Sequence, residues 1–177
     1  MHTLIVGDKH IGKSTLIQKV IRELGCPVAG FETKKEEGLA DVEKGSPVYI
    51  YPAGKPRRQS EENLLGYSKK QQTKVFSPAF DRAAKWLADA EVPGGLLLMD
   101  EIGIMEASSE AFCAEILRRL DGGTPVLAAV KNKDHPFLAA VRHHPNCHCF
   151  SISEENREDL FPVVLEFVRE QLDGGKE

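Results

Sequence analysis

Short apolar runs alternate along this chain with longer stretches in which apolar residues recur every three or four positions. The short runs predict strands at about 3–6, 27–33, 47–51, 96–99, 125–130 and 147–152. The stretches with helical spacing predict helices at about 15–24, 77–90, 109–120, 136–143 and 157–172. This alternation predicts an α/β fold with a mostly parallel sheet and helices on both of its faces. In such a fold, ligands bind at the carboxyl ends of the strands.

Two regions interrupt this alternation. Residues 42–43 and 47–51, separated by a turn at Gly45, predict a β-hairpin that extends one edge of the sheet. Residues 52–76 lack periodicity and are basic, which favours a mobile solvated loop or a lid that closes over phosphates. A nucleic-acid patch is a third interpretation, which the scarcity of aromatic residues disfavours. The basic residues of this insert are Lys55, Arg57, Arg58, Lys69, Lys70 and Lys74.

The most specific pattern follows the first strand, at residues 7–14, called the phosphate loop below. A glycine, four free positions and Gly-Lys-Ser form a P-loop pattern, with an apolar strand before it and a helix after it. Glycines allow backbone N–H groups to turn towards a phosphate at the positive end of a helix. We expect Lys13 to reach the β- and γ-phosphates and the Ser14 hydroxyl to ligate Mg²⁺. The residues expected at the nucleotide are Gly7, Asp8, Lys9, His10, Ile11, Gly12, Lys13, Ser14 and Thr15.

Two carboxylates end the apolar run at 96–99. Asp100 stands at the carboxyl end of this predicted strand, where it is expected to hold Mg²⁺ opposite Ser14. Glu101 follows directly, and because side chains alternate along a strand, we expect it to project to a different side. A carboxylate there is suited to orient and deprotonate a water that attacks the γ-phosphate. Lys13 and Glu101 are therefore the predicted catalytic residues.

Composition narrows the class of protein. The 177 residues suffice for one α/β domain with a substantial core, which predicts a single domain over 1–177. A net charge of −4 disfavours a broad nucleic-acid surface. No apolar run approaches membrane-spanning length and no signal-peptide pattern is present, so we expect a cytoplasmic protein that binds no membrane.

The segment His143-His-Pro-Asn-Cys147-His-Cys149 contains several candidate zinc ligands. Its alternating residues are also typical of a strand that enters the sheet, and no second ligand pair is evident elsewhere. Buried, reduced thiols are the favoured interpretation of its cysteines.

Several segments together resemble one known family. Asp100-Glu-Ile-Gly-Ile-Met-Glu106, followed by Ser109 and Phe112, resembles the DEIG-x-ME signature of the small cancer-related or thermophile-type nucleoside triphosphatases. Residues 30–33, 125–130 and 151–160 are similar to further segments of that family, so the resemblance covers nearly the whole chain. It implies a RecA-like P-loop fold and hydrolysis of ATP, GTP and other nucleoside triphosphates to the diphosphate and phosphate.

The sequence also departs from that family's pattern. The family's loop usually reads GxxGxGKTT, and His10 stands here where a glycine is usual. The family often has a lysine at the position of Ile104, and arginines where this chain has Lys34 and Lys35. Because such cations stabilise charge in the transition state, these departures predict slow hydrolysis. The candidate replacement cations are Lys131, Arg157, Arg57 and Arg58.

Two other functions stay open at this point. One is a nucleotide or small-metabolite kinase, with the insert at 52–76 as lid and acceptor site. The other is a nucleotide-dependent switch whose protein partner supplies the missing cation in trans.

Overall fold

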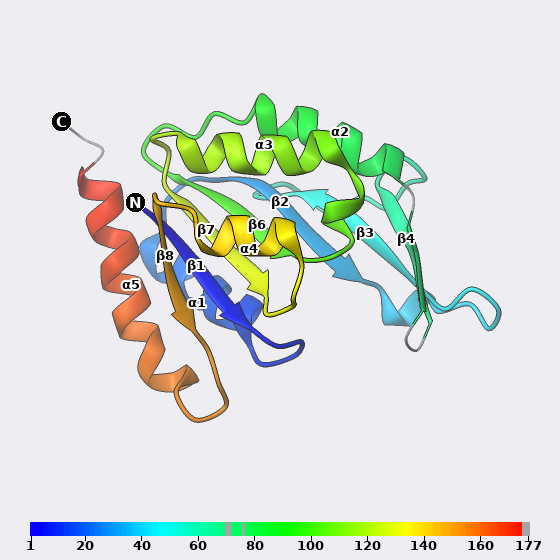
Figure 1. Cartoon of the computed structure of the whole chain (residues 1–177), viewed down its shortest axis with the longest axis horizontal. Coiled ribbons are helices and arrows are strands. Elements are labelled where there is room, and N and C mark those ends of the chain that lie inside the picture. The colour runs from blue at the N-terminus through cyan, green and yellow to red at the C-terminus, as the bar shows by residue number, and fades with distance from the viewer. Residues whose placement is uncertain (70–71, 76, 175–177) are drawn as a thin grey trace.

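The computed structural model describes residues 1–69, 72–75 and 77–174, and within this part of the chain eight strands form one sheet. The strand order is β5-β4-β3-β2-β6-β7-β1-β8 (Figure 1). The pairs β2–β6, β6–β7, β7–β1 and β1–β8 are parallel, and the pairs among β2, β3, β4 and β5 are antiparallel. The sheet therefore has a parallel part of five strands and an antiparallel extension of three.

The parallel part follows the predicted alternation of strands and helices. Its strands are β1 (His2–Gly7), β2 (Val28–Lys35), β6 (Leu96–Ile102), β7 (Val126–Lys131) and β8 (Cys147–Ser151). The helices are α1 (Lys13–Leu24), α2 (Ser77–Ala88), α3 (Glu110–Asp121), α4 (Pro136–Arg142) and α5 (Arg157–Gly174). Two short 3₁₀ turns, Glu37–Leu39 and Glu106–Ser108, follow β2 and β6. The α/β fold class is thus confirmed.

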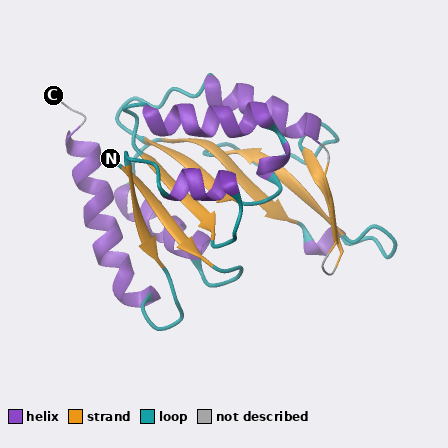
Figure 2. Cartoon of the chain, viewed as in Figure 1, coloured by secondary structure: helices purple, strands orange, loops and turns teal. Residues whose placement is uncertain are grey.

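Helices cover both faces of the sheet, and the molecule has two apolar clusters (Figure 2). One cluster joins α2, α3 and α4 to the sheet, with Phe31, Phe80 and Phe112 at its centre. The other joins α1 and α5 to the opposite face through residues such as Ile17 and Val164. Strands β6, β7 and β1 are buried almost throughout because they lie between both layers. Packing on both faces holds the carboxyl ends of these strands in place, and ligands bind at those ends in folds of this kind.

The edge hairpin was predicted at the wrong place. Strand β3 (Ser46–Pro52) pairs with β2, for example Thr33 with Ile50, and not with residues 42–43. Residues 42–43 lie in a turn closed by a bridge between Asp41 and Gly45, in which Asp41 accepts the N–H groups of residues 43 and 44. The local sequence indicated a turn correctly, but the partner of a strand is set by the whole sheet.

The insert at 52–76 is also more regular than predicted. It contains β4 (Leu64–Lys69) and β5 (Gln72–Val75), which continue the sheet beyond β3. Leu65 is fully buried in the first apolar cluster. Lys70, one of the basic residues predicted for this insert, lies outside the described residues. Among the described residues, no helix is long and apolar enough to cross a membrane.

Candidate functional site

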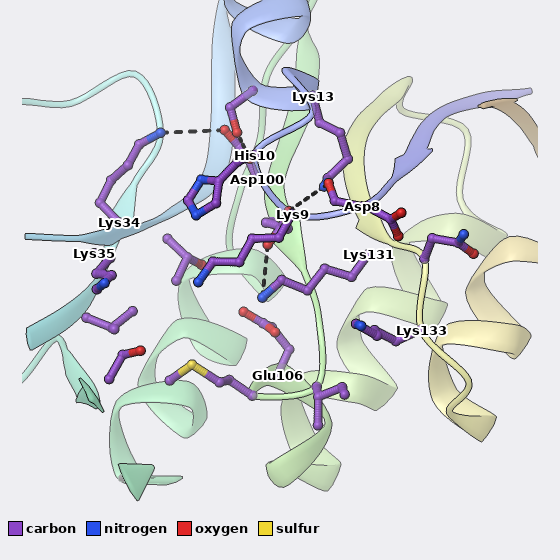
Figure 3. Close-up of a pocket in the computed structure, with 18 of the residues that line it drawn as sticks. Asp8, Lys9, His10, Lys13, Lys34, Lys35, Asp100, Glu106, Lys131 and Lys133 are labelled. Atoms are coloured by element: carbon purple, nitrogen blue, oxygen red, sulfur yellow. Dashed lines mark hydrogen bonds and ion pairs between the residues drawn. The ribbon is translucent and has the colours of Figure 1, made fainter. Parts of the chain in front are cut away.

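One large pocket opens at the carboxyl ends of β1, β2, β6 and β7, with a volume of about 1170 Å³ (Figure 3). Nine of the predicted site residues line it, and Gly7 and Ile11 do not. Ile11 instead packs against the apolar cluster under α1. The predicted residues in the pocket wall are Asp8, Lys9, His10, Gly12, Lys13, Ser14, Thr15, Asp100 and Glu101.

The backbone of the phosphate loop turns sharply before α1. Gly12 has φ of 109°, a conformation that favours glycine, and its carbonyl accepts the N–H of Leu16 as α1 begins. His10 also has a positive φ, 63°, and is the one such non-glycine residue in the described chain. The family resemblance places a glycine at this position, so the structure explains why a glycine is usual there. The loop opens onto the N-terminus of α1, where backbone dipoles favour an anion.

Lys13 is the most buried cation of the pocket, with 3% of its side chain exposed. Its Nζ donates to the carbonyl oxygens of Gly7 at 2.9 Å and Asp8 at 2.6 Å. The same nitrogen lies 3.0 Å from Glu101 Oε2. An ammonium has three donors, so all three have partners within the protein.

Ser14 and Asp100 lie opposite each other, as the sequence predicts. The Ser14 hydroxyl donates to Asp100 Oδ1 at 2.8 Å. Asp100 is almost fully buried, and its Oδ2 has no hydrogen-bond partner among the described residues; the nearest cation is Lys34 Nζ at 3.7 Å. Burial raises the pKa of Asp100, against the opposing charge of Lys34. A buried carboxylate oxygen without a donor, beside a hydroxyl, has the chemistry that a hard divalent cation takes as ligands.

Glu101 points into the same pocket as Asp100, contrary to the alternation expected along a strand. The register between β6 and β7 shifts here, because Asp100 pairs with Ala129 and Ile102 with the next residue, Val130. An extra residue of this kind is a β-bulge, which redirects side chains and is frequent beside active sites. Glu101 Oε1 lies 3.0 Å from Lys131 Nζ, while Oε2 contacts Lys13. The carboxylate therefore joins two ammonium groups.

Glu106, the last residue of the segment that resembles the family signature, is a further functional candidate. It is fully buried in the pocket wall, and its Oε2 accepts the backbone N–H of Gly103 at 2.7 Å. Burial raises the pKa of Glu106 to about 7, although the charge of Lys131 opposes the shift. A carboxylate three residues after the N–H that it accepts is a common local pattern, and this spacing was the signal available in the sequence.

Of the four candidate replacement cations, Lys131 lines the pocket. Arg57 instead pairs with Glu32 at 2.9 Å and lies over the ring of Tyr51. Arg58 and Arg157 are exposed and absent from the described pocket wall. Ile104, where the family often has a lysine, reaches the pocket as a half-exposed apolar side chain.

Strand β2 and the antiparallel extension form the far wall of the pocket. Thr33, Lys34 and Lys35 come from β2, and Val48 comes from β3. The insert at 52–76 reaches the pocket directly, because β4 and β5 each contribute a residue to its wall, Ser68 and Val75. The pocket therefore extends well beyond the phosphate loop.

The His143–Cys149 segment lies away from this pocket. His148 packs against the rings of Phe150 and Phe167, and the Cys149 thiol contacts the carbonyl of Arg142. Within the described part of the chain, no group of three or more His, Cys, Asp or Glu side chains is arranged to hold a metal ion.

Comparison with known proteins gives a consistent result. Residues 2–165 match the protein family described as NTPase. The nucleoside-triphosphatase THEP1 of Natranaerobius thermophilus is 26% identical over 185 residues, covering 96% of this chain and 97% of the relative. The cancer-related nucleoside-triphosphatase homolog of Bos taurus is 28% identical over 179 residues, covering 93% and 94%. The crystal structure of THEP1 from Aquifex aeolicus shares the fold, with a TM-score of 0.74 at 22% identity, covering 95% of this chain and 99% of that one.

Proposed function

The chain belongs to the NTPase family, and from this membership and the geometry of its pocket we propose that it hydrolyses nucleoside triphosphates to the diphosphate and phosphate. One observation supports this most directly. A buried lysine at the start of α1 and a carboxylate suited to activate water lie 3.0 Å apart in a single pocket. Phosphoryl transfer depends mainly on positioning and charge stabilisation, and this pair offers both.

The phosphate loop is the proposed binding site of the triphosphate. Backbone N–H groups at the start of α1 and the positive end of the helix favour the phosphate oxygens. The Lys13 ammonium exchanges its bonds to the carbonyls of Gly7 and Asp8 for bonds to the β- and γ-phosphates. Thr15, a residue of α1, also lines the pocket, which supports its proposed contact with the same phosphates.

Mg²⁺ is the proposed cofactor, held by the Ser14 hydroxyl and the Asp100 carboxylate. The Oδ2 of Asp100, which has no hydrogen-bond partner among the described residues, supports this assignment, because a buried carboxylate oxygen needs a partner. When bound, Mg²⁺ neutralises charge on the β- and γ-phosphates. Lys34, at 3.7 Å from Asp100, compensates part of that carboxylate's charge in the structure.

Glu101 is the proposed general base. It takes a proton from a water molecule while the water oxygen forms a bond to the γ-phosphorus. The bond from the γ-phosphorus to the bridging oxygen breaks, and its electron pair leaves with the diphosphate. General-base catalysis of this kind typically contributes about 10²–10⁴-fold to the rate.

Phosphate release from the purified protein tests this proposal. We expect release from ATP, GTP, CTP or UTP with Mg²⁺, none from the diphosphates, and little in the presence of EDTA. Glu101→Gln should lower turnover by about 10²–10⁴-fold while it still binds triphosphate in calorimetry. Equal phosphate release by the wild type and by Glu101→Gln would reject the assignment of the base.

A kinase is the second candidate, because the pocket is larger than one ligand site usually needs. Small-molecule pockets typically occupy roughly 300–1,000 Å³, and this one is about 1170 Å³ and reaches β4 and β5. That space beyond the phosphates would accommodate an acceptor molecule. Triphosphate labelled at the γ-position, incubated with nucleosides and nucleotides, distinguishes the two functions. Recovery of all the label as free phosphate excludes the kinase.

A further inference from the structure

Lys131 belongs to β7, whereas the phosphate loop follows β1 and the two carboxylates lie on β6. Strand β7 lies between β6, which carries Asp100 and Glu101, and β1, which leads into the phosphate loop. Lys131 is its last residue, and its side chain lies in the pocket wall (Figure 3). Its Nζ lies 3.0 Å from Glu101 Oε1. The strand order therefore brings a second ammonium to the carboxylate that Lys13 contacts.

The Lys131 side chain is held in place and is not a solvated strand end. About 28% of it is exposed, and it runs along Gly103 so closely that a Cβ there would lie 2.8 Å from Cδ and 3.1 Å from Nζ. A Cβ at this position would therefore displace the end of the lysine side chain from its contact with Glu101. The Lys131 carbonyl accepts from Arg142 at 3.2 Å, which anchors the end of β7.

The charges around Lys131 keep it protonated. Burial lowers its pKa, but the negative charges of Glu101 and Glu106 more than compensate, and the net effect is a raised pKa. The nitrogen contacts one oxygen of Glu101 while Lys13 contacts the other, so the two cations flank the same carboxylate. The lysines of β2 have different partners, Asp100 for Lys34 and Glu37 for Lys35.

We propose that Lys131 is a catalytic residue, whose ammonium contacts an oxygen of the γ-phosphoryl group and stabilises the negative charge that develops there during hydrolysis. The inference rests on the proposed function. A water activated by Glu101 must lie between that carboxylate and the γ-phosphorus, and the ammonium of Lys131 already contacts that carboxylate. Lys13 and Lys131 would then hold the γ-phosphoryl oxygens from two directions, in place of a cation supplied by a partner protein.

Binding of a transition-state mimic tests this contact without requiring fast turnover. Aluminium fluoride with a nucleoside diphosphate and Mg²⁺ imitates the transferring phosphoryl group. For Lys131→Met we expect diphosphate affinity within about twofold of wild type and a loss of roughly 10²-fold for the aluminium fluoride complex, the usual effect of removing one such donor. Lys131→Arg should retain part of the affinity. Lys85→Met, the same change on the exposed face of α2, is the matched control.

A second background separates contact with phosphate from positioning of Glu101. In the Glu101→Gln variant the side chain at position 101 is neutral and needs no cation to orient it. If the ammonium contacts the phosphoryl group, Lys131→Met should still lower the affinity for the aluminium fluoride complex in this background. A penalty that disappears in this background makes Lys131 a positioning residue and overturns the proposal. Equal binding of the complex by wild type and Lys131→Met also overturns it. A wild type that binds neither diphosphate nor its aluminium fluoride complex rejects the proposed function itself, and Lys131 with it.

Discussion

The phosphate loop and the β6 loop, residues 100–106, lie in contact in the pocket, with Ser14 2.8 Å from Asp100, and they are held in different ways. The phosphate loop is shaped by backbone geometry at His10 and Gly12, and its central side chain, Lys13, bonds to the loop's own carbonyls. The β6 loop is held by side chains, since buried Glu106 accepts the N–H of Gly103 and Lys131 packs across the same glycine. The phosphate loop thus carries hydrogen-bond donors, and the β6 loop holds carboxylates in position.

This difference shows how binding and reaction chemistry are divided in the proposed site. In this proposal, phosphate affinity depends on a few atoms that are contiguous in sequence. The proposed water activation depends on residues from β6 and β7, which are distant in the sequence and adjacent only through the sheet. We therefore expect substitutions in the phosphate loop to change mainly nucleotide affinity, and substitutions in the β6 loop to change mainly stability and turnover.

The largest expected effect is on affinity, from Lys13→Ala in the phosphate loop. The variant loses the ammonium that would bond to two phosphates, and charge-assisted bonds of this kind are strong. We expect triphosphate affinity to fall by about 10²-fold, roughly 3 kcal/mol, as measured by calorimetry. Lys19→Ala, on the exposed face of the same helix near Glu158, is the matched control and should bind normally. Retained tight binding by Lys13→Ala would mean that the loop is not the phosphate site.

In the β6 loop, Glu106→Gln should change how stability depends on pH. The folded protein raises the pKa of Glu106 from 4.5 to about 7, so between these values the folded state binds more protons than the unfolded state. The free energy of unfolding therefore falls as pH rises through this window, and the contribution is fully present only below it. The glutamine introduced in this variant does not titrate, and its carbonyl can still accept from Gly103.

Urea unfolding of both proteins at pH 5 and pH 8 measures this effect. At pH 5 the two stabilities should be similar. At pH 8 the variant should be more stable than wild type by roughly 2 kcal/mol, the scale of a shift of this size. A difference between the proteins that is the same at both pH values would contradict the raised pKa and the burial that causes it.

The smallest effect is expected for His10→Gly, which tests whether backbone strain in the phosphate loop matters. The left-handed conformation of His10 costs roughly 1–2 kcal/mol in a residue with a Cβ, and glycine avoids this cost. Glycine also gains freedom in the unfolded chain, which offsets about 0.5–1 kcal/mol. We expect a net stabilisation below about 1 kcal/mol in thermal unfolding. The neighbouring Lys9→Gly, where φ is not positive, should be destabilised instead.

The sequence predicted the parallel part of the fold well because its signals are local. The apolar run at 96–99 and the helical spacing of 15–24 belong to elements with buried faces, and β6 and α1 lie there. The spacing of the phosphate loop is likewise a requirement of its backbone, and the carboxyl end of an apolar strand locates Asp100, so Lys13, Ser14 and Asp100 could be placed together in advance. Their roles stay predictions until nucleotide binding is measured.

The remaining features depend on which segments become neighbours. Residues 47–51 were recognised as a strand, but only the sheet shows that β3 pairs with β2. Strands β4 and β5 were missed because charged residues and Gly66 interrupt their apolar pattern. The direction of Glu101 follows from a bulge, and the reach of Lys131 follows from strand order. None of these has a signal in the local spacing.

The Glu101 carboxylate bridges Lys13 and Lys131, so it competes with any incoming anion for these two ammonium groups. Both ammonium groups already have a negative partner, so a phosphate that binds here as proposed would enter by exchange and not by simple addition of charge. Small, weakly charged anions gain little from such an exchange, whereas a triphosphate presents enough oxygens to replace the carboxylate at both nitrogens. In the proposed site, the same exchange would release the carboxylate of Glu101, so the group that would accept a proton would become available when its target is in place.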